Sequence, residues 1–179
     1  MHMALQSRGW TLAELHRLPD DGNKYELVRG ELFVTPPPTP DHETVLSRLT
    51  RILDPYAAAN GLGMVYHPRS VVRFEGSEVE PDLMVRQPHS GGGANWDDWP
   101  LPTLVVEVLS DSTRRRDLGA KRTLYIDAGI PEYWIVDAAA RNIRVVRAPD
   151  GDEVVTDNLT WMPTGANDAL VVQVKTLLG

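Results

Sequence analysis

The segment Leu104-Val-Val-Glu-Val-Leu109 carries the strongest structural signal in the chain, because it is apolar on both faces and is interrupted once, by Glu107. A continuous apolar run of this length predicts a strand buried in the centre of a sheet. A lone ionised carboxylate there costs several kcal/mol unless it is paired or binds a cation. Glu107 is therefore a candidate functional residue. The structural alternative is an acid near a strand end that backbone donors or an arginine satisfy.

The residues after this strand predict a helix over Arg115–Ala128, followed by strands over Glu132–Val136 and Asn142–Val146. At about 100° per residue, Lys121 lies in the middle of the helix arc that carries most of its apolar side chains. A lysine at such a place either extends its ammonium to water or meets a buried carboxylate. Because the helix follows Glu107 after a short loop, we expect it to pack on the same sheet and to bring Lys121 near the acids.

Upstream, Val79–Arg86 predicts a further strand, in which Asp82 follows Pro81. The period of two along a strand places Glu80, Asp82 and Met84 on one face. Proline inside a strand indicates an edge or a bulge, where the direction of a side chain often changes. Asp82 is the second candidate acid, and an ordinary solvent-facing aspartate is the alternative.

The N-terminal third of the chain contains a short helix, a hairpin and a long helix. Thr11-Leu-Ala-Glu14 is typical of a capping box that opens a helix ending near Pro19. Lys24–Val34 predicts a β-hairpin that turns at Arg29-Gly30. Thr39 and Pro40 predict the start of a helix that runs to about Ala59. Strands over Gly63–His67 and Ser70–Phe74 and a polar loop over Ser90–Asn95 complete the pattern, while the sequence after Val146 is loosely patterned.

This order predicts one mixed α/β or α+β domain over residues 1–179, with a central mixed sheet flanked by helices and an N-terminal helix and hairpin. The chain has no cysteine, which excludes disulfides and cysteine-ligated metal sites. No apolar run approaches the roughly 20 residues that span a membrane. Met1–Arg8 lacks the layout of a secretory signal. We therefore expect a cytoplasmic protein.

The net charge of −7 is unusual for a tight DNA-binding protein. Five of the 18 basic residues lie between Arg114 and Arg122, a run that is most simply explained as a solvated helix face. Weak or transient binding to DNA is compatible with an acidic chain. Nothing in the sequence fixes the oligomeric state, and a homodimer stays open.

Two acids with a lysine nearby suit metal-assisted hydrolysis of a phosphodiester bond. Magnesium prefers oxygen ligands and keeps several waters, so Asp82 and Glu107 could hold it, with manganese as an alternative metal. The metal polarises the phosphate and helps to generate hydroxide from bound water. The ammonium of Lys121 could orient that water or stabilise the charge that develops on phosphorus. From the spacing alone, many kinds of hydrolase could use this set.

The sequence also resembles the Uma family of restriction-endonuclease-like proteins, which belongs to the PD-(D/E)XK nuclease superfamily. The resemblance extends from about Thr11 to Val146 and is strongest in the middle of the chain. The motifs that carry it are Tyr25-Glu-Leu-Val-Arg-Gly-Glu-Leu32, His42, Glu80-Pro-Asp-Leu-Met-Val85, Leu104-Val-Val-Glu-Val-Leu-Ser-Asp-Ser-Thr113, Asp117, Lys121 and Gly129-Ile-Pro-Glu-Tyr-Trp-Ile-Val-Asp137.

This resemblance implies a restriction-endonuclease-like core and magnesium-dependent cleavage of DNA, with Asp82 and Glu107 as metal ligands. The superfamily pattern calls for a lysine two residues after the second acid, where this chain has Leu109. The resemblance implies that Lys121 replaces that lysine, and the helical periodicity reaches the same residue independently. It also indicates Glu31 as a fourth acid, with a surface acid of the hairpin as the alternative. His42 lies either at the mouth of the site or at the cap of its own helix.

Two functions of different classes follow. The first is a metal-dependent endonuclease that hydrolyses DNA. The second is a catalytically inactive protein of the same fold that acts as a binding or regulatory module. The acidic net charge and the absence of the Glu-X-Lys lysine favour the second, whereas the intact set of Asp82, Glu107 and Lys121 favours the first.

Overall fold

The centre of the protein is a six-stranded mixed sheet in the order β10-β9-β8-β7-β6-β3. A computed structural model describes residues 9–91, 95–147 and 151–179. The segment with Glu107 forms β7, which pairs in parallel with β8 and antiparallel with β6. The strands are β3 (Met64–Tyr66), β6 (Leu83–Arg86), β7 (Leu104–Val108), β8 (Glu132–Asp137), β9 (Asn142–Arg147) and β10 (Gly151–Val155). The predicted mixed α/β fold with a central mixed sheet is confirmed.

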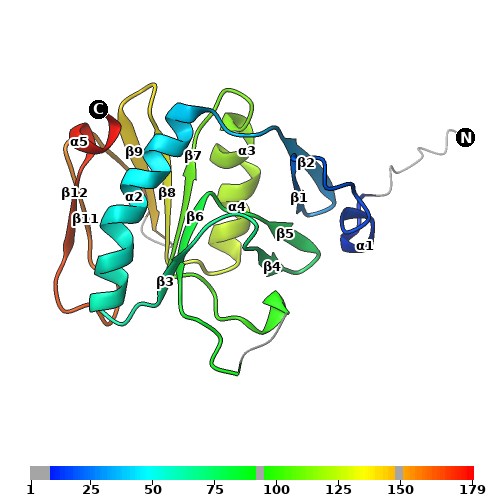
Figure 1. Ribbon diagram of the computed structural model, residues 1–179, viewed down its shortest axis with the longest axis horizontal. Helices are drawn as coiled ribbons and strands as arrows, with labels where there is room; N and C mark the ends of the chain where they lie inside the picture. Colours follow the sequence, from blue (N-terminus) through cyan, green and yellow to red (C-terminus); the bar gives the residue numbers. More distant parts are fainter. Residues whose placement is uncertain (1–8, 92–94, 148–150) are drawn as a thin grey trace, which may run out of the picture.

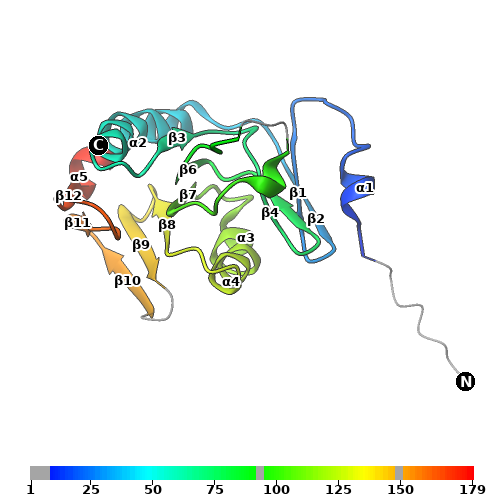
Figure 2. The same ribbon diagram turned by 90° about the horizontal axis from the view of Figure 1, so that it is seen from below.

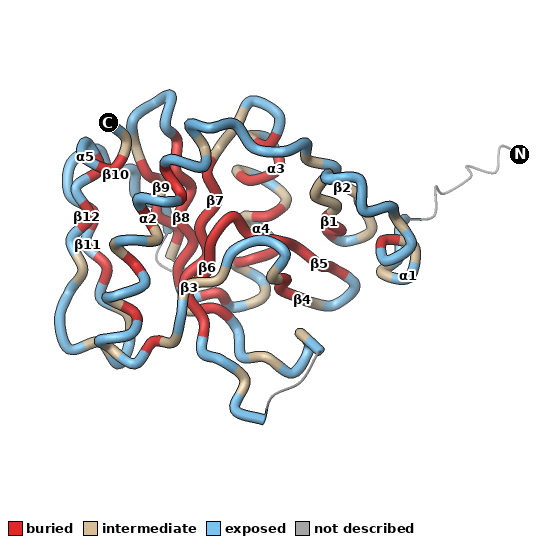
Figure 3. The backbone as a smooth tube through the Cα atoms, viewed as in Figure 1, coloured by how far each residue is buried: buried red, intermediate tan, exposed pale blue. Residues whose placement is uncertain are grey.

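Helices cover both faces of this sheet (Figures 1 and 2). The long helix α2 (Pro40–Ala59) packs on one face, and α3 (Arg114–Leu118) and α4 (Ala120–Asp127) lie on the other. All five residues of β7 are buried, as the unbroken apolar run predicted, and the buried tube in Figure 3 follows the central strands. Alternate residues of these strands therefore contact different helices.

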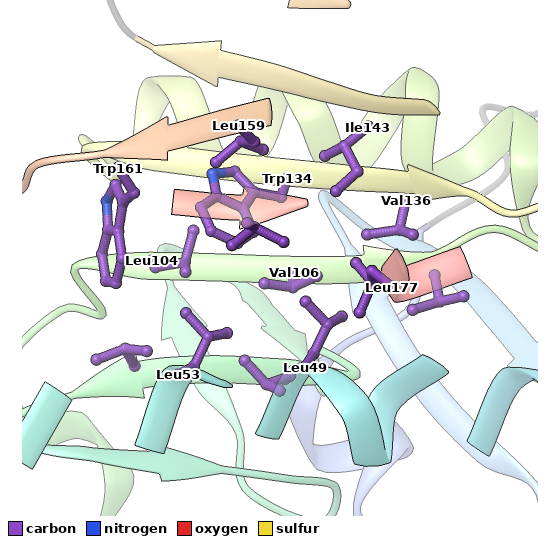
Figure 4. Packing of buried hydrophobic residues seen from close by; sticks show 14 of the residues in the cluster. Leu49, Leu53, Leu104, Val106, Trp134, Val136, Ile143, Leu159, Trp161 and Leu177 are labelled. Atoms are coloured by element: carbon purple, nitrogen blue, oxygen red, sulfur yellow. The ribbon is translucent and has the colours of Figure 1, made fainter. Parts of the chain in front are cut away.

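The alternation separates two hydrophobic clusters. Val106 and Trp134 belong to the cluster beneath α2, together with Leu49 and Leu53 of that helix. Figure 4 shows these side chains packed together between the central sheet and α2. Met84 and Val105 belong to the second cluster, which includes Leu124 and Tyr125 of α4. The face of β7 that carries Val105 also carries Glu107, so this acid lies on the side of α4.

A second, four-stranded sheet lies beside the central one, in the order β2-β1-β5-β4. It contains the predicted N-terminal hairpin, whose turn residues Arg29 and Gly30 have φ angles of 50° and 86°. Two central turn residues with positive φ match the right-handed twist of a tight hairpin. The short helix α1 begins at the capping box that Thr11, its N-cap, forms with Glu14. The bounds are α1 (Leu12–Leu15), β1 (Lys24–Val28), β2 (Glu31–Thr35), β4 (Val72–Phe74) and β5 (Ser77–Val79).

Two predicted elements are divided in the structure. The strand expected over Val79–Arg86 is split into β5 and β6, because Pro81 has no N–H to donate and the chain passes there from one sheet to the other. The helix expected over Arg115–Ala128 is split into α3 and α4 at Gly119, whose φ of −118° and ψ of −93° are not helical. Both breaks lie next to candidate site residues.

The C-terminal segment, for which the sequence pattern gave no assignment, adds a β-hairpin and a helix to the first hydrophobic cluster. Trp161 packs edge-on against Trp134, with ring centroids 5.7 Å apart. The elements are β11 (Asn158–Trp161), β12 (Leu170–Gln173) and α5 (Val174–Leu178), and a short 3-10 helix, η1 (Trp96–Asp98), precedes β7.

No helix within the described ranges is both long and apolar enough to cross a membrane. The expectations for Met1–Arg8 and for the centre of the loop over Ser90–Asn95 concern residues outside those ranges.

Two nearby glycines provide a test of the junction between α2 and β3. Gly61 and Gly63 both have positive φ, but a Cβ on Gly61 meets nothing within 4 Å, whereas a Cβ on Gly63 would lie 2.1 Å from the carbonyl oxygen of Arg86. We expect Gly61→Ala to lower the free energy of unfolding by about 1–2 kcal/mol, the cost of a left-handed alanine. Gly63→Ala should cost at least twice as much, because the backbone of β6 must move. Urea unfolding of both variants measures the difference, and equal losses would contradict the close approach of β3 and β6.

Candidate active site

Asp82 and Glu107 lie on one face of the central sheet. The antiparallel register pairs Leu83 with Val106, so Asp82, at the break before β6, comes opposite Glu107 on β7. Directly opposite residues of an antiparallel pair point to the same side. The carboxylate of Asp82 accepts the backbone N–H of Val108 at 2.9 Å, which fixes it beside the end of β7. Both acids therefore face the layer formed by α3, α4 and the hairpin.

Lys121 meets Glu107 inside the protein. Its Nζ lies 2.5 Å from Oε1 of Glu107, and its side chain has no solvent exposure. The ammonium therefore does not extend to water, which was the alternative for a lysine on the apolar side of this helix. The hydroxyl of Tyr125, one turn further along α4, donates to the same oxygen at 3.0 Å. Oε2 of Glu107 is buried and has no hydrogen-bond partner among the described residues.

A third acid, which the sequence analysis did not single out, completes the ion pairs of Lys121. Oε1 of Glu26, on β1, lies 2.6 Å from the lysine Nζ. The same oxygen accepts the backbone N–H of Glu80 at 2.9 Å, and Oε2 lies 3.1 Å from Nη1 of Arg116. Glu26 was missed because a glutamate in a short hairpin is most often solvent-exposed. The consecutive apolar residues Leu27 and Val28, both buried in the structure, were the one signal in the sequence that this strand is covered on both faces.

Two further basic side chains contact Asp82. Lys24, also on β1, donates to Oδ1 of Asp82 at 3.0 Å and to the carbonyl oxygen of Glu80 at 3.0 Å. His42, in the first turn of α2, places Nε2 3.5 Å from Oδ2 of Asp82. Its side chain is 15% exposed, so His42 lies between the buried acids and the solvent. The imidazole of His42 therefore lies at the edge of this cluster.

Glu31 does not join this cluster. It is exposed, at the turn end of the hairpin, and pairs with Val28 across the two strands. No hydrogen bond or ion pair within the described ranges joins it to Asp82, Glu107 or Lys121. The acid that the hairpin contributes is Glu26, on the other strand.

The cluster as a whole contains the carboxylates of Glu26, Asp82, Glu107 and Asp117 and the cations of Lys24, Lys121 and Arg116. Burial disfavours the charged form of Glu26, but the charges of Lys121, Lys24 and Arg116 outweigh it and hold its pKa below the ordinary value. The pKa of Asp82 is lowered in the same way, because Lys24 and His42 outweigh the effect of burial.

The pKa of Glu107 is shifted in the opposite direction to the pKa values of Glu26 and Asp82. Burial raises its pKa to about 8, and the negative charges of Asp82 and Asp117 act in the same direction, so the nearby ammonium of Lys121 does not compensate. Burial also raises the pKa of Tyr125 well above its ordinary value, which keeps its hydroxyl protonated and able to donate to Glu107. Glu107 is the acid that an additional positive charge would stabilise most.

The donor set suits a hard divalent cation. Within residues 9–91, 95–147 and 151–179, no three His, Asp or Glu side chains form a ready-made metal cage. Magnesium needs fewer protein ligands than this, since it is commonly held by one or two carboxylates, with waters and substrate phosphates for the rest. Asp82 and Glu107 supply two carboxylates on one face, and Oε2 of Glu107 has no hydrogen-bond partner among the residues that the structure describes. These two residues could therefore hold the ion.

Comparison with known proteins identifies the family and a solved structure of similar fold. The family model of Uma2, described as "Putative restriction endonuclease", matches residues 12–170. The chain is also similar to the crystal structure of a "putative nuclease belonging to DUF820" from Anabaena variabilis, with a TM-score of 0.80 and 19% sequence identity. The match covers 94% of this chain and 97% of that one. A comparison with curated proteins gave no match.

The raised pKa of Glu107 predicts how stability depends on pH in the absence of metal. Between about pH 5 and about pH 8 the folded protein retains a proton on Glu107 that the unfolded chain, with a pKa of about 4.3, has released. The free energy of unfolding should therefore fall as the pH rises, by at most about 1.4 kcal/mol per pH unit from this group. Urea unfolding in EDTA measures the slope. Glu107→Gln, which cannot ionise, should remove most of it, and an unchanged slope in this variant would contradict the assignment.

Proposed function

The chain belongs to the Uma2 family of putative restriction endonucleases, and from this premise we propose that it is a magnesium-dependent endonuclease that hydrolyses phosphodiester bonds of DNA. One observation carries the proposal. Glu107, in the centre of the sheet, has partners for one carboxylate oxygen, Lys121 and Tyr125, and none for the other within the described part of the chain, while the carboxylate of Asp82 faces the same side. Manganese, with the same preference for oxygen, is expected to replace magnesium.

Each residue of the cluster has a distinct part in this proposal. Asp82 and Glu107 would hold the metal, which when bound polarises a phosphate oxygen and lowers the pKa of water. The backbone N–H of Val108 orients Asp82, and the hydroxyl of Tyr125 orients Glu107. Lys121 brings a positive charge into a dry environment, where it stabilises the negative charge that develops on the phosphate.

The distribution of basic residues supports weak or transient binding of DNA. In the run between Arg114 and Arg122, Arg116 and Lys121 are buried in the ion-pair cluster. Arg114 and Arg122 pair with Asp137 and Asp152. Only Arg115 of this run is exposed without an acidic partner in the described part of the chain. The basic run is thus neither a solvated helix face nor a broad basic surface. Counterion release at α3 and α4 therefore contributes little to the affinity for DNA.

The alternative function, an inactive nuclease-fold binding module, is favoured by Leu109 at the motif position of the lysine and by the net charge of −7. The two functions differ in their response to metal. Calorimetric titration with magnesium or manganese should give heat for the wild-type protein and none for Glu107→Ala. The absence of heat at millimolar metal would favour the inactive module.

The direct test is cleavage of plasmid DNA with magnesium and with EDTA. We expect nicked or linear product with magnesium only, and none for Glu107→Ala, because one of two metal ligands is gone. Glu75→Gln, at an exposed turn of the second sheet, is the matched control and should cleave like the wild type. Cleavage that persists in EDTA would contradict the proposal.

Lys121→Met separates catalysis from metal binding, because it keeps the apolar stem and removes the ammonium. Turnover should fall by roughly two to three orders of magnitude, the scale seen when one electrostatic stabiliser is lost, while calorimetry should still detect metal. The variant should unfold at a lower temperature, since Glu26 and Glu107 lose their shared cation, and circular dichroism verifies that it is folded during the assay. Lys121→Arg should not restore the rate, because a planar guanidinium does not fit the place of a compact ammonium. Turnover like that of the wild type in the methionine variant would remove Lys121 from the site.

A further inference from the structure

Resting on the proposed function, we propose that Glu26 is the positioning residue of Lys121, so that the N-terminal hairpin is part of the active site. The ammonium of Lys121 lies between two carboxylates that come from different sheets. Its Nζ is 2.5 Å from Oε1 of Glu107, on the central sheet, and 2.6 Å from Oε1 of Glu26, on the hairpin sheet. Both acids are fully buried.

Glu26 is held rigidly enough to direct the lysine. Its Oε1 accepts the backbone N–H of Glu80, two residues before Asp82, and its Oε2 lies 3.1 Å from Nη1 of Arg116. Arg116 is in turn fixed by Asp117, with Nε 3.0 Å from Oδ1, and by the hydroxyl of Thr35, at 2.6 Å. Groups held by several hydrogen bonds position their partners more accurately than freely rotating ones.

The second anchor matters because Glu107 also has to face the metal. A lysine has a flexible four-carbon stem and three rotatable donors, so with one partner its ammonium would follow any movement of that partner. Glu26 keeps the ammonium in place independently of the position that Glu107 adopts. Glu26 also forms an ion pair with Lys121, so the ammonium is shared between Glu26 and Glu107.

The kinetic test combines Glu26→Gln and Glu26→Ala with Lys121→Met. If Glu26 acts through Lys121, Glu26→Ala should lower kcat by about 100-fold, the scale of a misplaced catalytic group. KM should change by less than about threefold, since Glu26 is buried away from DNA, and Glu26→Gln, which keeps an acceptor oxygen, should lose less. In the Lys121→Met background neither substitution should lower kcat further, because residues that act as a unit are not additive. A further loss in that background would overturn the proposal, as would normal kcat in Glu26→Ala.

A measurement that is independent of activity follows the ammonium itself. The chain has three lysines, Lys24, Lys121 and Lys175, so a spectrum of side-chain ¹⁵N resonances in metal-free protein is simple. Lys175 is exposed and should exchange rapidly with water, whereas the buried ammonium of Lys121 should give a slowly exchanging signal that is absent from Lys121→Met. Glu26→Ala should abolish or strongly shift this signal, and Glu75→Gln should leave it unchanged.

The two measurements distinguish the inference from the function on which it rests. If the wild-type protein does not cleave DNA but Glu26→Ala removes the Lys121 signal, the anchoring stands and the nuclease proposal fails. If the wild-type protein cleaves and the signal and kcat are unchanged in Glu26→Ala, Glu26 is not the positioning residue. Circular dichroism and calorimetric metal titration show whether each variant is folded and retains its metal site.

Discussion

The burial of the Glu107 carboxyl group is the constraint on which the other features of the structure depend. A carboxyl group on the central strand of a sheet is stable only if donors and cations reach it, because a buried polar group without partners costs free energy, and a buried charge without them costs several kcal/mol. Lys121 and Tyr125 satisfy this requirement from α4, and Glu26 then balances Lys121 from β1. Removing one member of such a network typically costs 3–5 kcal/mol. The same ion pairs therefore connect the central sheet, the hairpin sheet and α4. They attach the N-terminal hairpin to the core of the protein.

The breaks in regular structure serve this network. Pro81 ends β5 and lets the chain pass from the second sheet to the central one, so that Asp82 enters β6 opposite Glu107. Gly119 separates α3 from α4, and this break lies between Arg116 and Lys121, which both contact Glu26. An uninterrupted helix would place these two residues, five apart, about 140° from each other around its axis. The break thus allows two cations to reach one carboxylate.

The sequence predicted those parts of the site that violate a local pattern. Glu107 in an apolar strand and Lys121 on an apolar helix face were both identified in this way, and the mixed sheet followed from the order of the elements. Glu26 could not be found by the same reasoning, because its burial depends on contacts with residues 54 to 95 positions away in the chain. The C-terminal hairpin was missed for a similar reason, since its alternation is short and its packing on Trp134 is long-range.

The position of Leu109 explains why the lysine comes from a helix. Leu109 follows β7, donates its N–H to the carbonyl oxygen of Val136 at 2.9 Å and packs, partly buried, against the second hydrophobic cluster, which favours an apolar side chain there. A lysine two residues after Glu107 would be fixed by the strand itself, because alternate residues of a strand face the same side. A lysine on α4 instead reaches Glu107 from the helix layer that covers this face of the sheet. The backbone of β7 therefore does not fix its position. Moving the ammonium from the strand to the helix therefore requires a second acid to hold it, and in this structure Glu26 lies in that place.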